Sequence, residues 1–240
     1  TLSMNIKRIS YTLMAILWTL CPAVAFAQPT DVKSSIQFSC VVWTDLSYPA
    51  LYFRQGDEFL PLTLLPRQRS QIYSLQGREA LELYVAKDQA NGTPGHELVG
   101  RAALPQGAKQ MLFMIQESPS GGKLPLTVYG MDDSLDAFPA GSFRFLNFTN
   151  LPLQVEFGGT TNKLSPQAIK VVQPEIPELG GFLPFMIKDS EGRTGFQTRL
   201  FGQPRGRKMV LIVPPTKMGE KLAVLFLPQI VPPPPPESNR

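Results

Sequence analysis

The apolar run Gln110-Met-Leu-Phe-Met-Ile115 has a counterpart in Lys208-Met-Val-Leu-Ile-Val213, 98 residues further along the chain. In both places a loop containing glycine follows the run, and a Lys-Leu pair then opens another apolar segment at the same spacing. An ungapped alignment of Arg101–Gly130 with Arg199–Pro228 contains five identities in thirty positions. This repeated order of strand, loop and strand predicts an internal duplication.

The duplication also predicts which positions are equivalent. In the ungapped register Met111 corresponds to Met209, and Leu124 corresponds to Leu222. The beginnings of the two copies are similar as well, since Ser35-Ile-Gln-Phe38 resembles Ser142-Phe-Arg-Phe145. If the copies share a fold, each of these pairs occupies the same place in its own domain.

Short apolar runs separated by turn residues dominate the chain after residue 28. The 24 prolines and 19 glycines disfavour long helices. Runs of four to eight residues rich in Val, Phe, Leu or Tyr are typical of strands. We expect strands at Ile36–Trp43, Ala50–Arg54, Ala80–Ala86, Glu97–Ala103, Gln110–Gln116, Leu124–Tyr129, Ser142–Phe148, Leu153–Phe157, Ala168–Val172, Phe182–Ile187, Phe196–Leu200, Lys208–Val213 and Leu222–Phe226.

The expected fold is all-β, with two tandem small antiparallel β-sandwich-like domains related by internal duplication. A chain of 240 residues with 43% hydrophobic residues has enough apolar material for such cores. Short connections between successive strands favour antiparallel pairing. The expected parts are a signal peptide at 1–27, a first domain at 35–132, a connector at 133–141, a second domain at 142–230 and a Pro-rich disordered tail at 231–240.

The connector is acidic but contains two apolar side chains. Asp133 or Ser134 can cap one helical turn, which would place Leu135 and Phe138 on the same side. An apolar aromatic residue in so polar a segment favours docking over flexibility. We therefore expect Phe138 to be buried where the two domains meet.

The first 27 residues have the features of a cleaved signal peptide. Lys7 and Arg8 precede the apolar run Ile9–Leu20, and Ala25 and Ala27 supply the small residues that signal peptidase recognises. A membrane anchor is the alternative, but the run is shorter than the roughly 20 residues that span a bilayer. A lipoprotein is a second alternative, which the large Leu20 before Cys21 disfavours. The chain is therefore expected in the periplasm or outside the cell, and to meet the membrane only transiently.

Charge and cysteine content exclude several function classes. Loss of Lys7 and Arg8 lowers the formal net charge of +4 by two, so the mature chain is nearly neutral and nucleic acid is not an expected partner. One histidine and two cysteines exclude zinc fingers and iron–sulfur sites, and no cofactor is predicted. Cys40, the one cysteine after the signal peptide, lies in an apolar run and is expected as a buried thiol.

Catalysis is not expected. His96 lies in a loop-like segment, and no Gly-x-Ser-x-Gly motif presents a nucleophile to it. Paired carboxylates could support glycoside hydrolysis, and calcium binding is a milder alternative for the same acids. The candidate acids are Asp132, Asp133, Asp136, Glu175 and Glu178.

Two features point to binding. The segment with Arg193 and Arg199 continues to a hairpin tip with Arg205, Arg207 and Lys208, which could contact lipid phosphate or an acidic polysaccharide. The alternative is a charged loop that keeps a β edge soluble. Aromatic residues could also form a platform for sugars, although Trp43 follows an apolar strand and is more typical of a core. The aromatic candidates are Trp43, Tyr48, Tyr52 and Phe53.

The string Asp132-Asp-Ser-Leu-Asp-Ala-Phe-Pro-Ala-Gly-Ser-Phe-Arg-Phe-Leu-Asn-Phe-Thr149, followed by Pro152-Leu-Gln-Val155 and Gly158-Gly159, resembles a group of small exported proteins of verrucomicrobial-type bacteria. The resemblance implies a bacterial exported protein and transfers no functional residue. The sequence thus favours a non-enzymatic binding or scaffolding protein whose partner is another protein or an envelope polysaccharide. A carbohydrate-binding accessory module and a hydrolase with paired carboxylates are the alternatives.

Overall fold

The computed structural model describes residues 35–88, 92–118, 122–214 and 222–230, which all belong to one compact unit. The predicted signal peptide, with Ala25 and Ala27, and the predicted Pro-rich tail lie outside the described residues. In the part that is described, no helix has the length and apolarity to cross a membrane.

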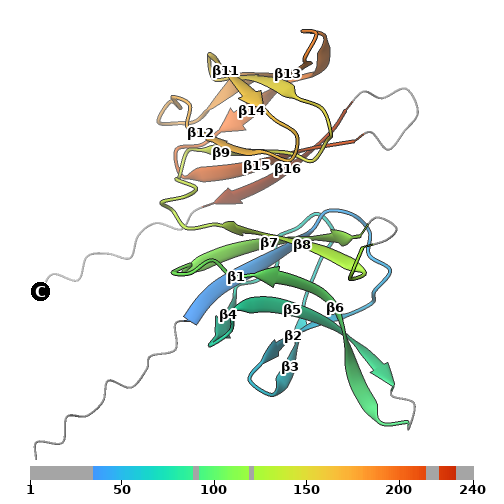
Figure 1. Ribbon diagram of the computed structural model, residues 1–240. Helices are drawn as coiled ribbons and strands as arrows, with labels where there is room; N and C mark the ends of the chain where they lie inside the picture. Colours follow the sequence, from blue (N-terminus) through green and yellow to red (C-terminus); the bar gives the residue numbers. More distant parts are fainter. Residues whose placement is uncertain (1–34, 89–91, 119–121, 215–221, 231–240) are drawn as a thin grey trace, which may run out of the picture. The chain divides into compact units, whose positions relative to one another are not determined.

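The described chain is all-β, as the sequence predicts (Figure 1). The first eight strands are β1 (Ser35–Val42), β2 (Leu51–Gln55), β3 (Glu58–Leu62), β4 (Tyr73–Gln76), β5 (Ala80–Asp88), β6 (Pro94–Ala103), β7 (Gln110–Glu117) and β8 (Leu126–Asp132). The second eight are β9 (Phe143–Asn147), β10 (Leu153–Phe157), β11 (Thr160–Leu164), β12 (Ile169–Val172), β13 (Gly181–Asp189), β14 (Thr194–Gly202), β15 (Gly206–Val213) and β16 (Ala223–Ile230).

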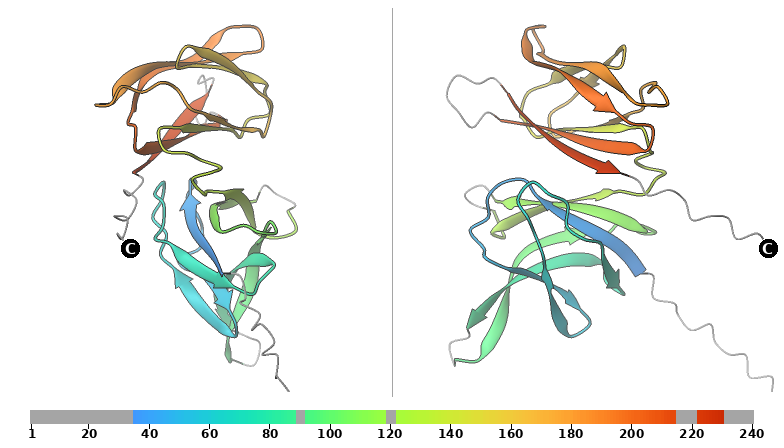
Figure 2. Two further views of the ribbon diagram at one scale, coloured as in Figure 1. Left: turned by 90° about the vertical axis from the view of Figure 1, so that its left-hand side faces the viewer. Right: turned by 180° about the vertical axis from the view of Figure 1, so that it is seen from behind.

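The two sets of strands have the same topology. In the first set the sheet orders are β4-β1-β7-β8 and β3-β2-β5-β6, and in the second they are β12-β9-β15-β16 and β11-β10-β13-β14. Adding eight to every label of the first set gives the second. The structure therefore contains two similar sandwich-like units, each made of two four-stranded sheets. Figure 2 shows these units from two further sides.

Each sandwich contains one parallel strand pair that the sequence does not predict. β1 pairs in parallel with β7, and β9 pairs in parallel with β15. A parallel pair needs a long crossover, and here five intervening strands provide it. The short connections that favour antiparallel pairing apply only to strands that follow each other directly, so they do not restrict this pair.

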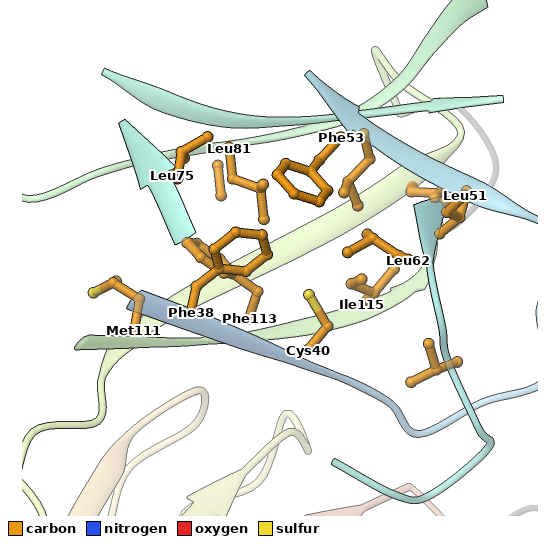
Figure 3. Packing of buried hydrophobic residues seen from close by; sticks show 14 of the residues in the cluster. Phe38, Cys40, Leu51, Phe53, Leu62, Leu75, Leu81, Met111, Phe113 and Ile115 are labelled. Carbon is orange, nitrogen blue, oxygen red and sulfur yellow. The ribbon is translucent and has the colours of Figure 1, made fainter. Parts of the chain in front are cut away.

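Aromatic residues fill both sandwiches. In the first core, the Phe38 ring lies 5.2 Å from Phe53 and 5.8 Å from Phe113 (Figure 3). In the second core, the Phe145 ring lies 5.4 Å from Phe157 and 5.5 Å from Phe185. These rings come from strands of facing sheets, so each core holds its two sheets together.

The predicted equivalence of Met111 and Met209 is wrong. Met111 belongs to the first core, as Figure 3 shows, whereas Met209 lies in a third apolar cluster outside the second core. The residues of β15 that face the second core are Val210 and Ile212. Because side chains alternate between the faces of a strand, the ungapped register is displaced by an odd number of residues. The duplication is visible in the strand order, but not in that alignment.

The predicted equivalence of Leu124 and Leu222 is wrong for a related reason. Leu222 packs against the second core, whereas in the first sandwich Leu126 takes part in the core. β8 begins nine residues after the end of β7, whereas β16 begins ten residues after the end of β15. The ungapped register requires the two connections to have equal length.

The connector forms one tight turn. Phe138 N donates to Ser134 O at 2.9 Å, and Ala137 N lies 3.3 Å from Ser134 Oγ, so Ser134 caps the turn as predicted. Phe138 is buried, with 1% of its surface exposed, but Leu135 is 51% exposed. The expectation that Leu135 and Phe138 share a side is therefore wrong.

Candidate functional site

A third apolar cluster joins the two sandwiches within the compact unit. The first sandwich contributes residues of β1, β7 and β8, the second contributes residues of β9 and β15, and Phe138 of the connector lies among them. The buried members are Val41, Leu112, Met114, Met131, Phe138, Leu146, Met209, Leu211 and Val213. At its margin Trp43 stacks on Phe148 with ring centroids 5.1 Å apart. We call this region the joint.

A buried carboxylate lies at the edge of the joint. Asp133 follows β8 directly and is 0% exposed. Its Oδ2 accepts hydrogen bonds from Arg69 Nη2 at 2.5 Å and from Arg207 Nη2 at 3.3 Å, and Arg144 Nη1 lies 3.6 Å from Oδ1. These arginines come from the loop before β4, from β9 and from β15, so the ion network ties both sandwiches to the connector.

The two most buried arginines also bind the connector backbone. Arg207 Nη1 donates to the carbonyl oxygens of Asp133 and Phe138 at 3.0 and 2.9 Å. Arg144 Nη2 donates to the carbonyl oxygens of Asp132 and Ala137 at 2.8 and 3.3 Å. The turn is thereby held by its carbonyl groups, which a one-turn segment cannot satisfy internally.

Phe138 completes the arrangement. Its ring lies under both guanidinium groups, with Arg144 Cζ 4.2 Å and Arg207 Cζ 4.9 Å from the ring centroid. Contacts of this kind contribute about 2 kcal/mol or more where the cation is desolvated. Burial lowers the pKa of Arg144 to about 10 and also lowers the pKa of Arg207, with Asp133 opposing the shift in both. With this pKa Arg144 stays protonated at neutral pH.

The network is unbalanced in charge and incompletely hydrogen-bonded. Three guanidinium groups, from Arg69, Arg144 and Arg207, surround the buried carboxylate of Asp133. Four buried atoms of the network have no hydrogen-bond partner among the described residues: Asp133 Oδ1, Arg144 Nε, Arg144 Nη1 and Arg207 Nε. A buried unpaired polar group costs about 1–3 kcal/mol and calls for a functional or solvent explanation.

A cavity of about 320 Å³ adjoins the network. Its apolar walls are Val41, Phe138, Met209, Leu227 and Pro228, and its polar walls are Arg67, Gln68, Arg69 and Gln229. Gln229 also accepts a hydrogen bond from Arg207 Nη2 at 2.9 Å, so it links the cavity to the buried charges. The cavity combines apolar and cationic surface.

The structure separates the residues of the predicted basic hairpin tip. Arg205 is exposed in the turn between β14 and β15. Contrary to the sequence prediction, Arg207 does not lie exposed at the hairpin tip. It is only 4% exposed and forms an ion pair with Asp133. Its side chain shares a face of β15 with Met209 and therefore points into the joint. Lys208 lies half-buried on the other face, where Nζ donates to Phe201 O at 3.0 Å and burial lowers its pKa.

The other candidate residues are dispersed. His96 is exposed on β6 and stacks on Phe59 with centroids 3.8 Å apart. Asp136, Glu175 and Glu178 are exposed, and in the described ranges no group of three His, Cys, Asp or Glu side chains forms a metal site. Trp43 lies half-buried in the joint and so packs with apolar residues. Cys40 is a buried thiol, and burial raises its pKa.

Sequence reasoning missed Arg69 and Arg144. Arg144 lies between Phe143 and Phe145, whose side chains enter the second core, so its own side chain has the opposite orientation. Leu146 shares that opposite face and is also buried. An apolar residue two positions from an arginine in a strand was the available signal that this face is covered.

The comparisons with known proteins add no assignment. No protein-family model matches the chain, and no curated protein matches it significantly.

Proposed function

We propose that this chain is an exported, non-enzymatic binding or scaffolding protein of the bacterial periplasm or cell surface. The observation that carries the proposal is an exposed aromatic face on the second sandwich. Phe182 is 62% exposed and Phe201 is 38% exposed, and their ring centroids lie 5.1 Å apart. Clustered exposed apolar side chains commonly mark interaction sites.

This face belongs to the sheet β11-β10-β13-β14. Phe182 pairs with Phe201 across β13 and β14, and Pro184 pairs with Arg199 two positions along. Beside these pairs lies a hollow of about 430 Å³, lined in part by Pro184, Met186 and Arg199. Apolar rings next to a cation and a hollow are suited to a protein segment or a polysaccharide chain.

The joint supports a scaffolding role. Apolar contacts, the Asp133 network and the Phe138 ring connect the two sandwiches through the connector. A pair of sandwiches held in this way presents its outer faces at a defined spacing. Export rests on Lys7, Arg8 and the Ala25-Phe26-Ala27 site, and the resemblance of the segment Asp132–Thr149 to exported bacterial proteins agrees with it.

Two measurements test the proposal. The chain is produced with its N-terminal segment in a Gram-negative host, and the N-terminus of the material released by osmotic shock is sequenced. We expect it to begin at Gln28. Recovery only as an intact, membrane-embedded chain would exclude export of this kind.

The purified chain is then sedimented with peptidoglycan sacculi and with outer-membrane fragments from the host. We expect retention that is lost when Phe182→Ser and Phe201→Ser are combined. Ile169→Ser is the matched control, because Ile169 is 51% exposed on β12 in the other sheet. Equal retention of all variants would contradict a role for this face.

A carbohydrate-binding accessory module is the second candidate, supported by a separate aromatic cluster on the first sandwich. The Phe59 ring lies 4.9 Å from Tyr84 and stacks on His96, which lies 5.1 Å from Tyr52. Affinity electrophoresis in gels that contain soluble glucans or xylan tests it. Retardation that Tyr52→Ala abolishes would favour this candidate over the exposed Phe182 face.

A further inference from the structure

We propose that the cavity beside the Asp133 network binds a small amphipathic anion, with a carboxylate or phosphate head group on a short apolar body. The loop between β3 and β4 supplies Arg67 and Arg69, the connector supplies Phe138, and β16 supplies Leu227 and Gln229. The cavity is separate from the aromatic face of the second sandwich, so this proposal does not depend on the proposed function.

The charge of the surroundings favours an anion. Arg69, Arg144 and Arg207 meet only one carboxylate of the described residues within ion-pair distance, that of Asp133. The neighbouring Asp132 is exposed, and its Oδ1 accepts a hydrogen bond from Ser134 N at 2.9 Å. The buried part of the network therefore carries excess positive charge, which attracts an anion strongly because little water screens it.

Arg67 provides a free cation at the cavity wall. Among the described residues its guanidinium has no hydrogen bond and no ion pair, although its backbone N donates to Val42 O at 2.7 Å. Its φ is 58°, in the left-handed region that L side chains other than Asn and Asp seldom adopt. Gln167 has the same φ in the matching loop between β11 and β12, so this backbone geometry belongs to the loop of both sandwiches, and the free guanidinium is what distinguishes Arg67.

The partly exposed Arg69 links the cavity to the buried charges. Its side chain is 22% exposed, and its Nη2 binds Asp133 Oδ2. An anionic head between Arg67 and Arg69 would interact with two guanidinium groups, which are the side chains best suited to planar or tetrahedral oxyanions. It would also compensate the excess charge of the network.

The apolar residues that line the cavity favour a ligand whose remaining part is apolar. Val41, Phe138, Met209 and Leu227 supply the apolar part of the lining next to the cations. A volume of about 320 Å³ is at the lower end of the range for small-molecule sites, which run from about 300 to 1,000 Å³. A short acyl chain or a single ring is therefore the appropriate size, and a polymer is not.

Octanoate and octyl phosphate are the test probes, titrated into the purified chain by calorimetry and by thermal unfolding. We expect both to bind saturably and to raise Tm, because each combines an anionic head with an apolar chain. Octan-1-ol lacks the charge and acetate lacks the chain, so neither reproduces the effect at the same concentration. If octan-1-ol raises Tm as octanoate does, or if neither anion binds at about 10 mM, the proposal is overturned. A difference between the two anions identifies the preferred head group.

Variants locate the site. Arg67→Gln is expected to weaken octanoate binding about tenfold or more by removing a charge-assisted contact. Arg205→Gln is the matched control, because Arg205 is an exposed arginine in the turn before β15 and outside the cavity wall. It is expected to bind octanoate as the unchanged chain does.

Arg67→Gly separates binding from stability. Glycine adopts a positive φ without strain, so this variant is expected to have a Tm no lower than that of the unchanged chain while it loses octanoate affinity. A lower Tm together with full octanoate affinity would assign Arg67 a structural role and contradict the proposal. Equal octanoate affinity of Arg67→Gln and Arg205→Gln would contradict it as well.

Discussion

The outer faces of the two sandwiches differ although their strand orders are the same. In the first sandwich the ring of Phe59 stacks on the exposed His96, and Tyr84 OH donates to Glu82 at 2.8 Å. In the second, Phe182 and Phe201 occupy the corresponding sheet, and 62% and 38% of their surfaces are exposed. The inner faces, in contrast, both hold clusters of phenylalanine.

This difference shows which part of a duplicated sandwich is constrained. Alternate residues of each strand face the core, where size and packing restrict substitution, and the intervening residues are free to change. The same fold can therefore carry a cluster of stacked aromatic rings with a histidine in one copy and an exposed phenylalanine pair in the other. The joint is a third situation, in which outer faces have become buried.

The largest effect is expected from Phe138→Ala, which removes the ring shared by both sandwiches. We expect the free energy of unfolding to fall by about 3–5 kcal/mol, since a buried aromatic side chain is lost. Calorimetry should then resolve two transitions, and Trp43 fluorescence should change before either core unfolds, because Trp43 stacks on Phe148 in the joint.

Leu135→Ala is the control in the same turn, and its exposed side chain predicts a change within about 0.5 kcal/mol. A single transition in the Phe138→Ala variant, with unaltered Trp43 fluorescence, would mean that the sandwiches do not depend on this ring.

Asp133→Asn tests the ion network with almost no change in shape. Removing the carboxylate charge leaves three guanidinium groups without their counter-ion, which we expect to cost about 3 kcal/mol. Urea denaturation at low and at high salt measures this loss. Because the groups are buried, most of the loss should persist at high salt. The exposed Asp136, changed to Asn, is the control, and equal stability of the two variants would refute the role of the network.

A double-mutant cycle sharpens the comparison of Met111 and Met209. Met209 and Phe138 belong to the same cluster, so their alanine substitutions should be coupled by about 0.5–3 kcal/mol. Met111 faces the first core, and its coupling to Phe138 should stay within about 0.5 kcal/mol. Equal coupling energies would contradict the placement of Met111 and Met209 in different clusters and would favour their predicted equivalence.

The smallest effect concerns Lys208 and depends on pH. Burial lowers the pKa of this ammonium group in the folded chain below 10.5, so the unfolded chain binds the proton more tightly. The desolvation penalty is present in full at neutral pH and disappears as the pH rises through the folded pKa, which makes stability rise with pH. As the pH rises from neutral to 10.5, the free energy of unfolding of the unchanged chain should increase by less than about 1 kcal/mol relative to that of Lys208→Met. The effect is small because the ammonium group keeps contact with water. Urea midpoints measured between neutral pH and pH 10.5 check the sign, and a relative loss would contradict it.

The strands that the sequence does not predict are β3, β4 and β11, and each lies at the edge of its sheet. β11 reads Thr-Thr-Asn-Lys-Leu and β4 reads Tyr-Ser-Leu-Gln, so neither has a sustained apolar pattern. An edge strand has one paired side and needs few buried side chains, and polar residues there also prevent unwanted pairing. Propensity alone therefore identifies the central strands better than the edges.

The candidate site was only partly predictable. An apolar ring in the acidic connector predicts the burial of Phe138, and the pair of aspartates marks Asp133 as a residue of interest. Arg207 was identified, but as a surface residue, because adjacent positive charges in a turn region are typical of exposed loops. Its face of β15 also carries Met209 and Leu211, which lie in the joint. Only the presence of a covering element turns such a face into an interior.

The sequence by itself determines the β class and the duplication, because these follow from local composition and from the order of similar segments. Only the tertiary structure decides that β1 and β7 run in parallel, that Met111 and Met209 face different clusters, and that Asp133 gathers arginines from both sandwiches. The physical reason is that pairing direction, register and the covering of an outer face depend on segments distant in the chain. The local sequence around a charged residue is the same whether its side chain faces water or another sheet.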